Sequence, residues 1–135
     1  MADRAAETPV DPAVLKLAGR ALESIHQPAP DHLDLVTLKG DASSRSYHRI
    51  HLPGRTPSSL VLMQLAMDPL KSDEFTEWDP PEYPFTLVQR YLEEGHLPVP
   101  RIHGARPDQG WLVLQDLGDV TLESVLLDCT PSQMR

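Results

Sequence analysis

A run of small residues, Gly40-Asp41-Ala42-Ser43-Ser44, is the first part of the sequence whose composition suits a chemical task. In a tight loop, side chains this small let backbone N–H groups approach phosphate oxygens, as the glycine-rich loops of kinases do. The run has a single glycine, however, and lacks the G-x-G-x-x-G spacing of protein kinases. From the residues alone, a phosphate-binding loop and an ordinary hairpin turn are therefore both open.

Two arginines, Arg45 and Arg49, follow this run at an even spacing. They fall in a segment typical of a β-strand, so both project to one face of it, together with Tyr47 and His51. On that face they either neutralise the charge of a bound phosphate or lie against solvent. The alternation does not decide which face is inward, so both interpretations stay open.

The remaining polar residues form no pattern for a metal site or a nucleophile. His48 and His51 are three residues apart on the same expected strand, so they point to opposite faces and cannot bind one metal ion together. Ser43 and Ser44 have no neighbouring base in the sequence. The acidic stretch 68–84 lacks the spacing and central glycine of a calcium loop, and we expect a solvated loop there.

The composition limits the classes of partner. Twelve Lys and Arg residues against 20 Asp and Glu residues give a formal net charge of −8, which disfavours a general binder of nucleic acid or anionic membranes. No apolar run approaches the roughly 18 residues of a membrane span. Cys129 is the single cysteine and so forms neither an internal disulfide nor a cysteine-based zinc site. We expect a cytoplasmic protein that binds neither nucleic acid nor a membrane.

Three helices and five strands are expected to position the candidate residues. Asp11-Pro12 caps a helix over 12–26, Gly95 ends a helix over 84–94, and Thr121 caps a short helix over 121–127. Strands are expected over 32–38, 45–52, 60–65, 101–105 and 111–115. A three-stranded meander and a hairpin with one helix between them predict an α+β fold with an antiparallel sheet of about five strands.

Three stretches of the sequence, Leu38 to Ile50, Leu97 to Ile102 and Trp111 to Asp119, occur in this order. Together they resemble the amino-terminal lobe of the aminoglycoside phosphotransferase and choline kinase family. The likeness is closest to the bacterial kinases that phosphorylate N-acetylmuramate and N-acetylglucosamine in cell-wall recycling. The resemblance covers about residues 34–127 and implies a kinase-like nucleotide-binding lobe there. A leading helix and linker over 1–33 precede this lobe, and a tail over 128–135 follows it.

The resemblance implies an ATP site built from two turns. The loop from Gly40 to Arg45 would cover the phosphates, and the backbone of Gln115 to Gly118 would be the hinge that binds adenine. Gln64 or its neighbour stands where many family members place a phosphate-binding lysine. Helix 84–94 has Thr86 and Leu87 where the paired acid would be expected, and its glutamates Glu93 and Glu94 lie at its far end. The implied nucleotide-binding residues are Gly40, Asp41, Ala42, Ser43, Ser44, Arg45, Gln64, Gln115, Asp116, Leu117 and Gly118.

The catalytic groups of the family lie in a second lobe, which supplies an H-x-D base and an aspartate for Mg²⁺. No H-x-D follows Gly118, and His32-Leu33-Asp34 precedes the first expected strand, which is the wrong order. No catalytic residue or metal ligand is therefore assigned. The resemblance implies the ATP-binding lobe of a phosphotransferase that acts on a sugar or amino-sugar hydroxyl, with the sugar and Mg²⁺ bound through a second lobe.

A non-catalytic adaptor is the alternative. Such a protein would be a kinase-like lobe that has lost nucleotide binding and uses its surface for protein contacts. In a lone lobe, Leu122, Val125 and Leu126 on helix 121–127 would be exposed, and an apolar patch of this kind favours a partner protein or a dimer. Whether the chain is an enzyme stays open in both interpretations.

Overall fold

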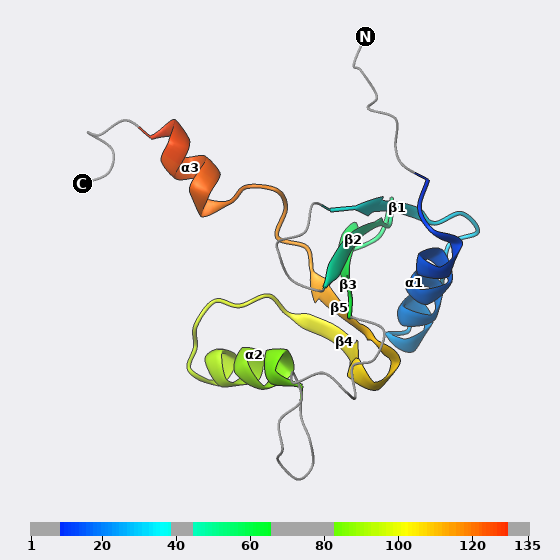
Figure 1. Ribbon diagram of the computed structural model, residues 1–135, viewed down its shortest axis with the longest axis horizontal. Coiled ribbons are helices and arrows are strands. Elements are labelled where there is room, and N and C mark those ends of the chain that lie inside the picture. The colour runs from blue at the N-terminus through cyan, green and yellow to red at the C-terminus, as the bar shows by residue number, and fades with distance from the viewer. Residues whose placement is uncertain (1–8, 39–44, 66–82, 130–135) are drawn as a thin grey trace.

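A computed structural model describes residues 9–38, 45–65 and 83–129. These residues form one five-stranded antiparallel sheet with three α-helices (Figure 1). The strands are β1 (Asp34–Thr37), β2 (Ser46–His51), β3 (Ser59–Gln64), β4 (Ile102–Arg106) and β5 (Trp111–Gln115). The helices are α1 (Pro12–Ser24), α2 (Pro84–Glu94) and α3 (Leu122–Asp128). The predicted α+β class and five-stranded antiparallel sheet are confirmed.

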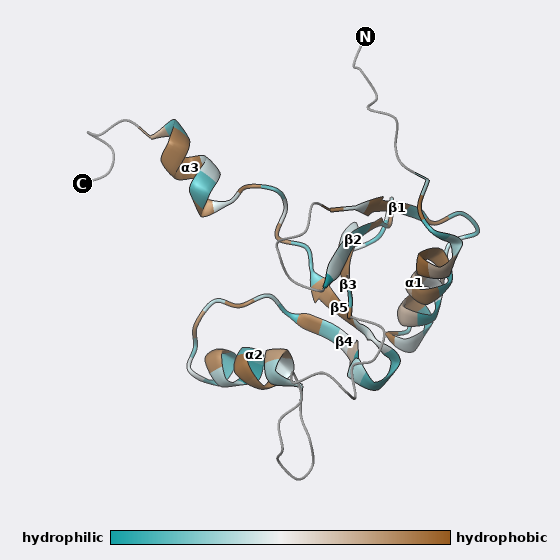
Figure 2. Ribbon diagram, in the orientation of Figure 1, coloured by the Kyte–Doolittle hydropathy of each residue, from teal (hydrophilic) through white to brown (hydrophobic). Residues whose placement is uncertain are grey.

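The sheet has the strand order β1-β2-β3-β5-β4. After β3 the chain passes through α2 to the far strand β4, and β5 then returns between β3 and β4. The central strands β3 and β5 are the most hydrophobic ones (Figure 2), and the first four residues of β5 are all buried. Strands buried on both faces carry nearly continuous apolar runs, which suits the place of β5 inside the sheet, between β3 and β4.

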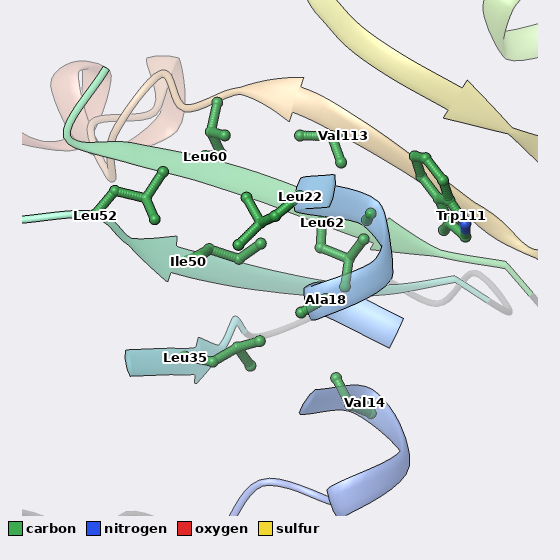
Figure 3. Close-up of a cluster of buried hydrophobic side chains, with 11 residues drawn as sticks. Val14, Ala18, Leu22, Leu35, Ile50, Leu52, Leu60, Leu62, Trp111 and Val113 are labelled. Atoms are coloured by element: carbon green, nitrogen blue, oxygen red, sulfur yellow. The ribbon is translucent and has the colours of Figure 1, made fainter. Parts of the chain in front are cut away.

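Helix α1 covers one face of the sheet and forms the larger core. Asp11 caps it by accepting a hydrogen bond from the N–H of Ala13 at 2.8 Å, as predicted. The buried stripe of the helix packs on inward-facing strand residues (Figure 3), and Ala18 is small enough for close contact. This core consists of Val14, Ala18, Ala21, Leu22, Leu35, Ile50, Leu52, Leu60, Leu62, Trp111 and Val113.

The end of α1 lies close to the sheet at Gly104 of β4. A Cβ placed on Gly104 would collide with the side chain of Ile25, the C-cap residue of α1. The helix ends at Ser24, two residues earlier than predicted, because His26 adopts a positive φ of 60° that a right-handed helix does not allow. The glycine in β4 therefore makes room for the end of the helix.

The opposite face of the sheet is covered less completely. Its core joins Met63, Leu65, Tyr83, Leu112 and Leu114. Helix α2 begins at Pro84 and is followed by the C-cap Gly95, as predicted, but none of its own residues is buried. Its attachment comes through Tyr83 at its N-cap, which is 2% exposed, and through the partly buried Phe85. We call this side of the sheet, opposite the side that α1 covers, the α2 face.

Helix α3 follows β5 and lies away from the sheet (Figure 1). Thr121 caps it through a reciprocal pair of hydrogen bonds with Ser124, which confirms the predicted cap. None of its residues is buried, and its large apolar side chains Leu122, Val125, Leu126 and Leu127 are all exposed. No helix among the described residues is long and apolar enough to cross a membrane.

Candidate functional site

The residues predicted to bind a nucleotide are described only in part. Gly40, Asp41, Ala42, Ser43 and Ser44 lie outside the described residues, as do most of the acidic stretch 68–84 and of the tail 128–135. The structure does describe the chain on either side of the small-residue run. The N–H of Leu38 donates to the carbonyl of Tyr47 at 2.8 Å, so the run connects two paired strands. This is the position that a hairpin loop requires.

Strand register places the two arginines on the α2 face. Ile50 of β2 packs in the α1 core, so its neighbours Arg49 and His51 point to the other side of the sheet. Tyr47 lies on that same side and packs on the α2-face core. The guanidinium of Arg45 lies 5.7 Å from the ring centroid of Tyr83, which belongs to this core. The predicted common face therefore exists, and it is the one that α2 borders.

Arg49 binds two carboxylates from the segment that follows β5. Its Nε donates to Oδ2 of Asp116 at 2.7 Å, and its Nη2 donates to Oδ1 at 3.1 Å. Its Nη1 donates to both oxygens of Asp119, at 2.9 and 3.1 Å. The side chains of Arg49 and Asp116 are 13% and 7% exposed. Arg49 therefore lies mostly out of solvent and is the ion-pair partner of Asp116 and Asp119.

Asp116 also accepts hydrogen bonds from two other groups. The hydroxyl of Ser59 donates to Oδ2 at 2.7 Å, and the N–H of Gly118 donates to Oδ1 at 2.9 Å. We call Arg49, Ser59, Asp116, Gly118 and Asp119 the Arg49 cluster. The hydrogen bond from Arg49 is the main cause that lowers the pKa of Asp116 from 3.8 to about 2, against the opposing effect of burial. The carboxylate is ionised at neutral pH.

The Arg49 cluster and Arg45 lie at opposite ends of one face. Strands β2 and β5 both run antiparallel to β3, so they run in the same direction, and both end near the cluster. Arg45 stands at the start of β2, next to the small-residue run. It is four positions from Arg49 along an extended chain, or about 13 Å. A ligand that contacts both turns must therefore be elongated.

Gln64 points away from this face. It lies opposite Trp111 of β5, whose side chain belongs to the α1 core. Its Oε1 accepts a hydrogen bond from Nε2 of His48 at 3.1 Å, and Nδ1 of His48 lies 3.0 Å from Oγ1 of Thr37. The neighbouring residue Met63 is the one that faces the α2 side, and it is fully buried. Neither residue brings a positive charge to that face.

A cavity of about 590 Å³ lies on the side of the sheet that α1 covers, where the start of α1 meets β1 and β2. It is lined by Pro9, Val10, Asp11, Val14, Leu35, Val36, Thr37 and His48, and none of the predicted nucleotide-binding residues is among them. The described part of the chain holds no group of three or more His, Cys, Asp or Glu residues arranged for a metal ion.

Sequence reasoning missed the pairing within the Arg49 cluster. Arg49 and Asp116 are 67 positions apart, and their contact depends on the order β2-β3-β5 and on its register. The face of Arg49 and the turn at Asp116 were each visible in the sequence, but no local pattern relates them. The sequence held one partial signal for this contact. Arg49 is an even number of positions from Tyr47, so both lie on the face of the sheet from which Arg49 contacts Asp116.

The chain was compared with known proteins in three ways. No family model matches it, and neither the curated proteins nor the solved structures gave a significant match.

Proposed function

We propose that the five-stranded sheet and α2 form the nucleotide-binding lobe of an ATP-dependent phosphotransferase that acts on a sugar or amino-sugar hydroxyl. The small-residue loop from Gly40 to Arg45 binds the phosphates, and the backbone turn from Gln115 to Gly118 binds adenine. Mg²⁺ and the sugar are bound by a second, catalytic lobe. The chain would then be kinase-like, as its resemblance to the aminoglycoside phosphotransferase family implies.

One observation carries this proposal: the end of β1 and the start of β2, which flank the small-residue run in the sequence, lie at the opposite end of the sheet from the turn after β5. A nucleotide is an elongated ligand with a flat base at one end and phosphates at the other. The separation of about 13 Å along β2 suits such a ligand. The insertion of α2 between β3 and β4 is the element order that the resemblance implies.

The charges of the face agree with this polarity. Arg45 provides a cation at the proposed phosphate end, where it lies over the rings of Tyr83 and Phe85 at 5.7 and 5.8 Å from their centroids. On the neighbouring strand β3 the residue that faces this side is Met63, which is neutral and buried, whereas Gln64 points to the other side. Phosphate binding would therefore depend on Arg45 and on backbone N–H groups rather than on a lysine.

The proposal is tested by titrating the protein with ATP and Mg²⁺ while its amide chemical shifts are followed by NMR. We expect saturable shift changes in two groups of amides, Gly40 to Arg45 and Gln115 to Gly118, with the same dissociation constant. Inorganic triphosphate should shift the first group alone, because it has no base. Absence of any change in both groups at millimolar ATP would refute the nucleotide site.

A substitution in the turn provides the matched test. Gly118 has φ 81° and no heavy atom within 4 Å of the position of an added Cβ, and Gly54 in the β2–β3 turn has φ 75° and the same open surroundings. Valine strains the backbone equally at both positions. We expect Gly118→Val to weaken ATP binding at least tenfold in calorimetry and Gly54→Val to leave it unchanged. Equal affinities in the two variants would remove the turn from the site.

A protein-interaction lobe is the second candidate, and the exposure of α3 favours it. Leu122 and Leu127 are 74% and 79% exposed, and Leu117 and Val120 before the helix are 66% and 79% exposed. Apolar side chains gathered in this way are typical of an interface. If this candidate is right, Leu126→Asp abolishes association measured by sedimentation, whereas Val36→Asp on the exposed side of β1 does not.

A further inference from the structure

The cavity at the start of α1 has an apolar wall that continues the α1 core. Its volume of about 590 Å³ lies within the range of about 300–1,000 Å³ that is typical of sites for small organic ligands. Val14 and Leu35, which belong to the core in Figure 3, line it, and Val10 of the lining packs against the same core. Pro9 and Val36 complete the apolar part. A ligand in this cavity would therefore contact mostly hydrocarbon.

The polar part of the lining consists of Asp11, Thr37 and His48. His48 is 4% exposed, and each of its ring nitrogens has a partner. Oε1 of Gln64 can only accept, so Nε2 of His48 donates the hydrogen bond of 3.1 Å between them. In a neutral imidazole Nδ1 is then the acceptor, and the hydroxyl of Thr37 donates to it at 3.0 Å. Because this uses the only proton of the hydroxyl, Oγ1 of Thr37 can only accept from a ligand.

The first turn of α1 has no spare N–H donor. Pro12 has no N–H, and the N–H of Ala13 donates to Oδ1 of Asp11 at 2.8 Å. The N–H groups of Val14 and Leu15 both donate to the main-chain carbonyl of Asp11, at 2.9 and 3.2 Å. The groups that make the start of a helix a site for anions are therefore already occupied here.

The charge of the lining is negative. Asp11 is its one acidic residue, and the lining residues that the structure describes include no lysine or arginine. A carboxylate accepts hydrogen bonds at both oxygens, so Asp11 can cap the helix through Oδ1 and still accept from a ligand. The cavity thus combines acceptors and a negative charge with an apolar wall, which suits a cation that has a hydrocarbon body.

We propose that this cavity binds a small apolar amine in its protonated form. The ammonium group donates to the carboxylate of Asp11 and to the hydroxyl oxygen of Thr37, and His48 fixes the direction of that hydroxyl. The hydrocarbon part packs on Val14 and Leu35. The amine site is independent of the proposed nucleotide site, because none of the predicted nucleotide-binding residues lines the cavity.

The test compares three ligands that share a phenylethyl body and differ in their polar group: phenethylamine, phenethyl alcohol and hydrocinnamate. The full chain is titrated with each at about pH 8, where alkylammonium groups are charged and imidazoles are ordinarily neutral, while amide chemical shifts are followed. We expect the amine to bind with a dissociation constant of about 1 mM, the alcohol about fivefold more weakly and hydrocinnamate not at all. The shifts should be largest at Val14, Leu35 and His48.

Substitution of Asp11 tests the role of the charge. Asp11→Asn removes the charge and keeps the cap of α1, since asparagine caps a helix as well as aspartate does. We expect it to weaken amine binding about fivefold and to leave binding of the alcohol unchanged. Glu23→Gln is the matched control, because Glu23 is an exposed carboxylate at the other end of α1 and outside the lining. This variant should bind the amine like the wild type.

Substitution of Thr37 tests the role of the hydroxyl. Thr37→Val should weaken amine binding about threefold, whereas Thr37→Ser, which keeps an acceptor oxygen, should bind the amine like the wild type. Asp11→Asn and Thr37→Ser keep the test decisive if Thr37→Val does not fold.

Three results would each overturn the proposal. The first is the absence of saturable shifts at about 10 mM phenethylamine. The second is equal affinity for the amine and hydrocinnamate, which would mean that the cavity accepts any apolar ligand. The third is unchanged amine binding in both Asp11→Asn and Thr37→Val, which would place the amine elsewhere. None of these results bears on the nucleotide site, which the ATP titration tests separately.

Discussion

Asp116 shows what one side chain contributes when several donors converge on it. Its carboxylate is 7% exposed and accepts hydrogen bonds from Arg49, Ser59 and Gly118. Burial alone would raise the pKa of a carboxyl group, but these donors lower it to about 2. Because the ionised form is bound more strongly in the folded protein than in the unfolded chain, the cluster makes stability depend on pH.

The first prediction concerns acid unfolding. The pKa of Asp116 is 3.8 in the unfolded reference and about 2 in the folded protein. The carboxylate therefore contributes about 2 kcal/mol to the free energy of unfolding above pH 4, and this contribution is lost as the pH falls toward 2. Urea titrations at several pH values should show a steeper loss of stability in the wild type than in Asp116→Asn.

The control for this prediction is Asp108→Asn. Arg106 lowers the pKa of Asp108 mainly through a side-chain hydrogen bond, but the Asp108 side chain is 54% exposed. Exposed pairs of this kind contribute little to stability. Its pH profile should therefore follow that of the wild type. Parallel profiles for the wild type and Asp116→Asn would show that the cluster contributes nothing to acid stability.

The second prediction concerns Gly104, where an added methyl group has no room. The Cβ of an alanine there would collide with Ile25, and overpacking of this kind costs about 1–3 kcal/mol. Gly19 in α1 has no heavy atom within 4 Å of the same position, so Gly19→Ala should raise stability by about 0.5–1 kcal/mol. Thermal unfolding of the two variants should give shifts of opposite sign. If Gly104→Ala unfolds at the same temperature as the wild type or a higher one, the close approach of α1 to β4 is contradicted.

At the scale of elements, α1 and the sheet form one core. Four buried residues of α1 belong to the same cluster as the inward-facing residues of β1, β2, β3 and β5. By contrast, α2 and α3 have no buried residue of their own. The contribution of each helix to stability should therefore differ sharply.

The third prediction compares two leucines on different helices. Leu22 of α1 is fully buried, and its replacement by alanine leaves a cavity that costs about 2–5 kcal/mol. Leu122 of α3 is 74% exposed, so Leu122→Ala should change stability by less than about 0.5 kcal/mol. Denaturant unfolding of both variants measures the difference. A destabilised Leu122→Ala protein would show that α3 packs against something in solution.

The elements were predictable from the sequence because their signals are local. Asp11, Pro84, Gly95 and Thr121 mark helix ends, and apolar periodicity marks the helices and strands between them. The place of β5 beside β3 was not predicted, because it depends on contacts between segments distant in the sequence. The same reason hid the Arg49–Asp116 pair and the Thr37–His48–Gln64 hydrogen bonds. The turn of Gly118 was visible, but not the carboxylate that orients it.

The whole molecule is stabilised unequally on its two sides. One face of the sheet packs on α1, whereas the α2 face is covered through Tyr83 and Phe85, and α3 extends away from the sheet. Hydrogen exchange depends on the free energy of local opening, which follows buried contacts. Backbone amides should therefore be protected most where the sheet packs on α1, less on the α2 face and least in α3.

The fourth prediction is that amides in β2, β3, β5 and α1 exchange slowest and those in α3 fastest. Mass spectrometry of deuterium uptake would measure this at the level of peptides. Helices α1 and α3 are both capped at their N-termini, so capping alone does not explain a difference between them. Similar protection in both helices would indicate that α3 is covered in solution, which is the result expected for the protein-interaction candidate.

The strand order makes β1 and β4 the two edge strands of the sheet. An exposed edge strand is a template to which another chain can add a strand. Edge strands that are short or irregularly paired are poor templates. Here β1 has only four residues, and the register of β4 shifts between Ile102 and Gly104. Both edge strands thus discourage growth of the sheet from one molecule into the next.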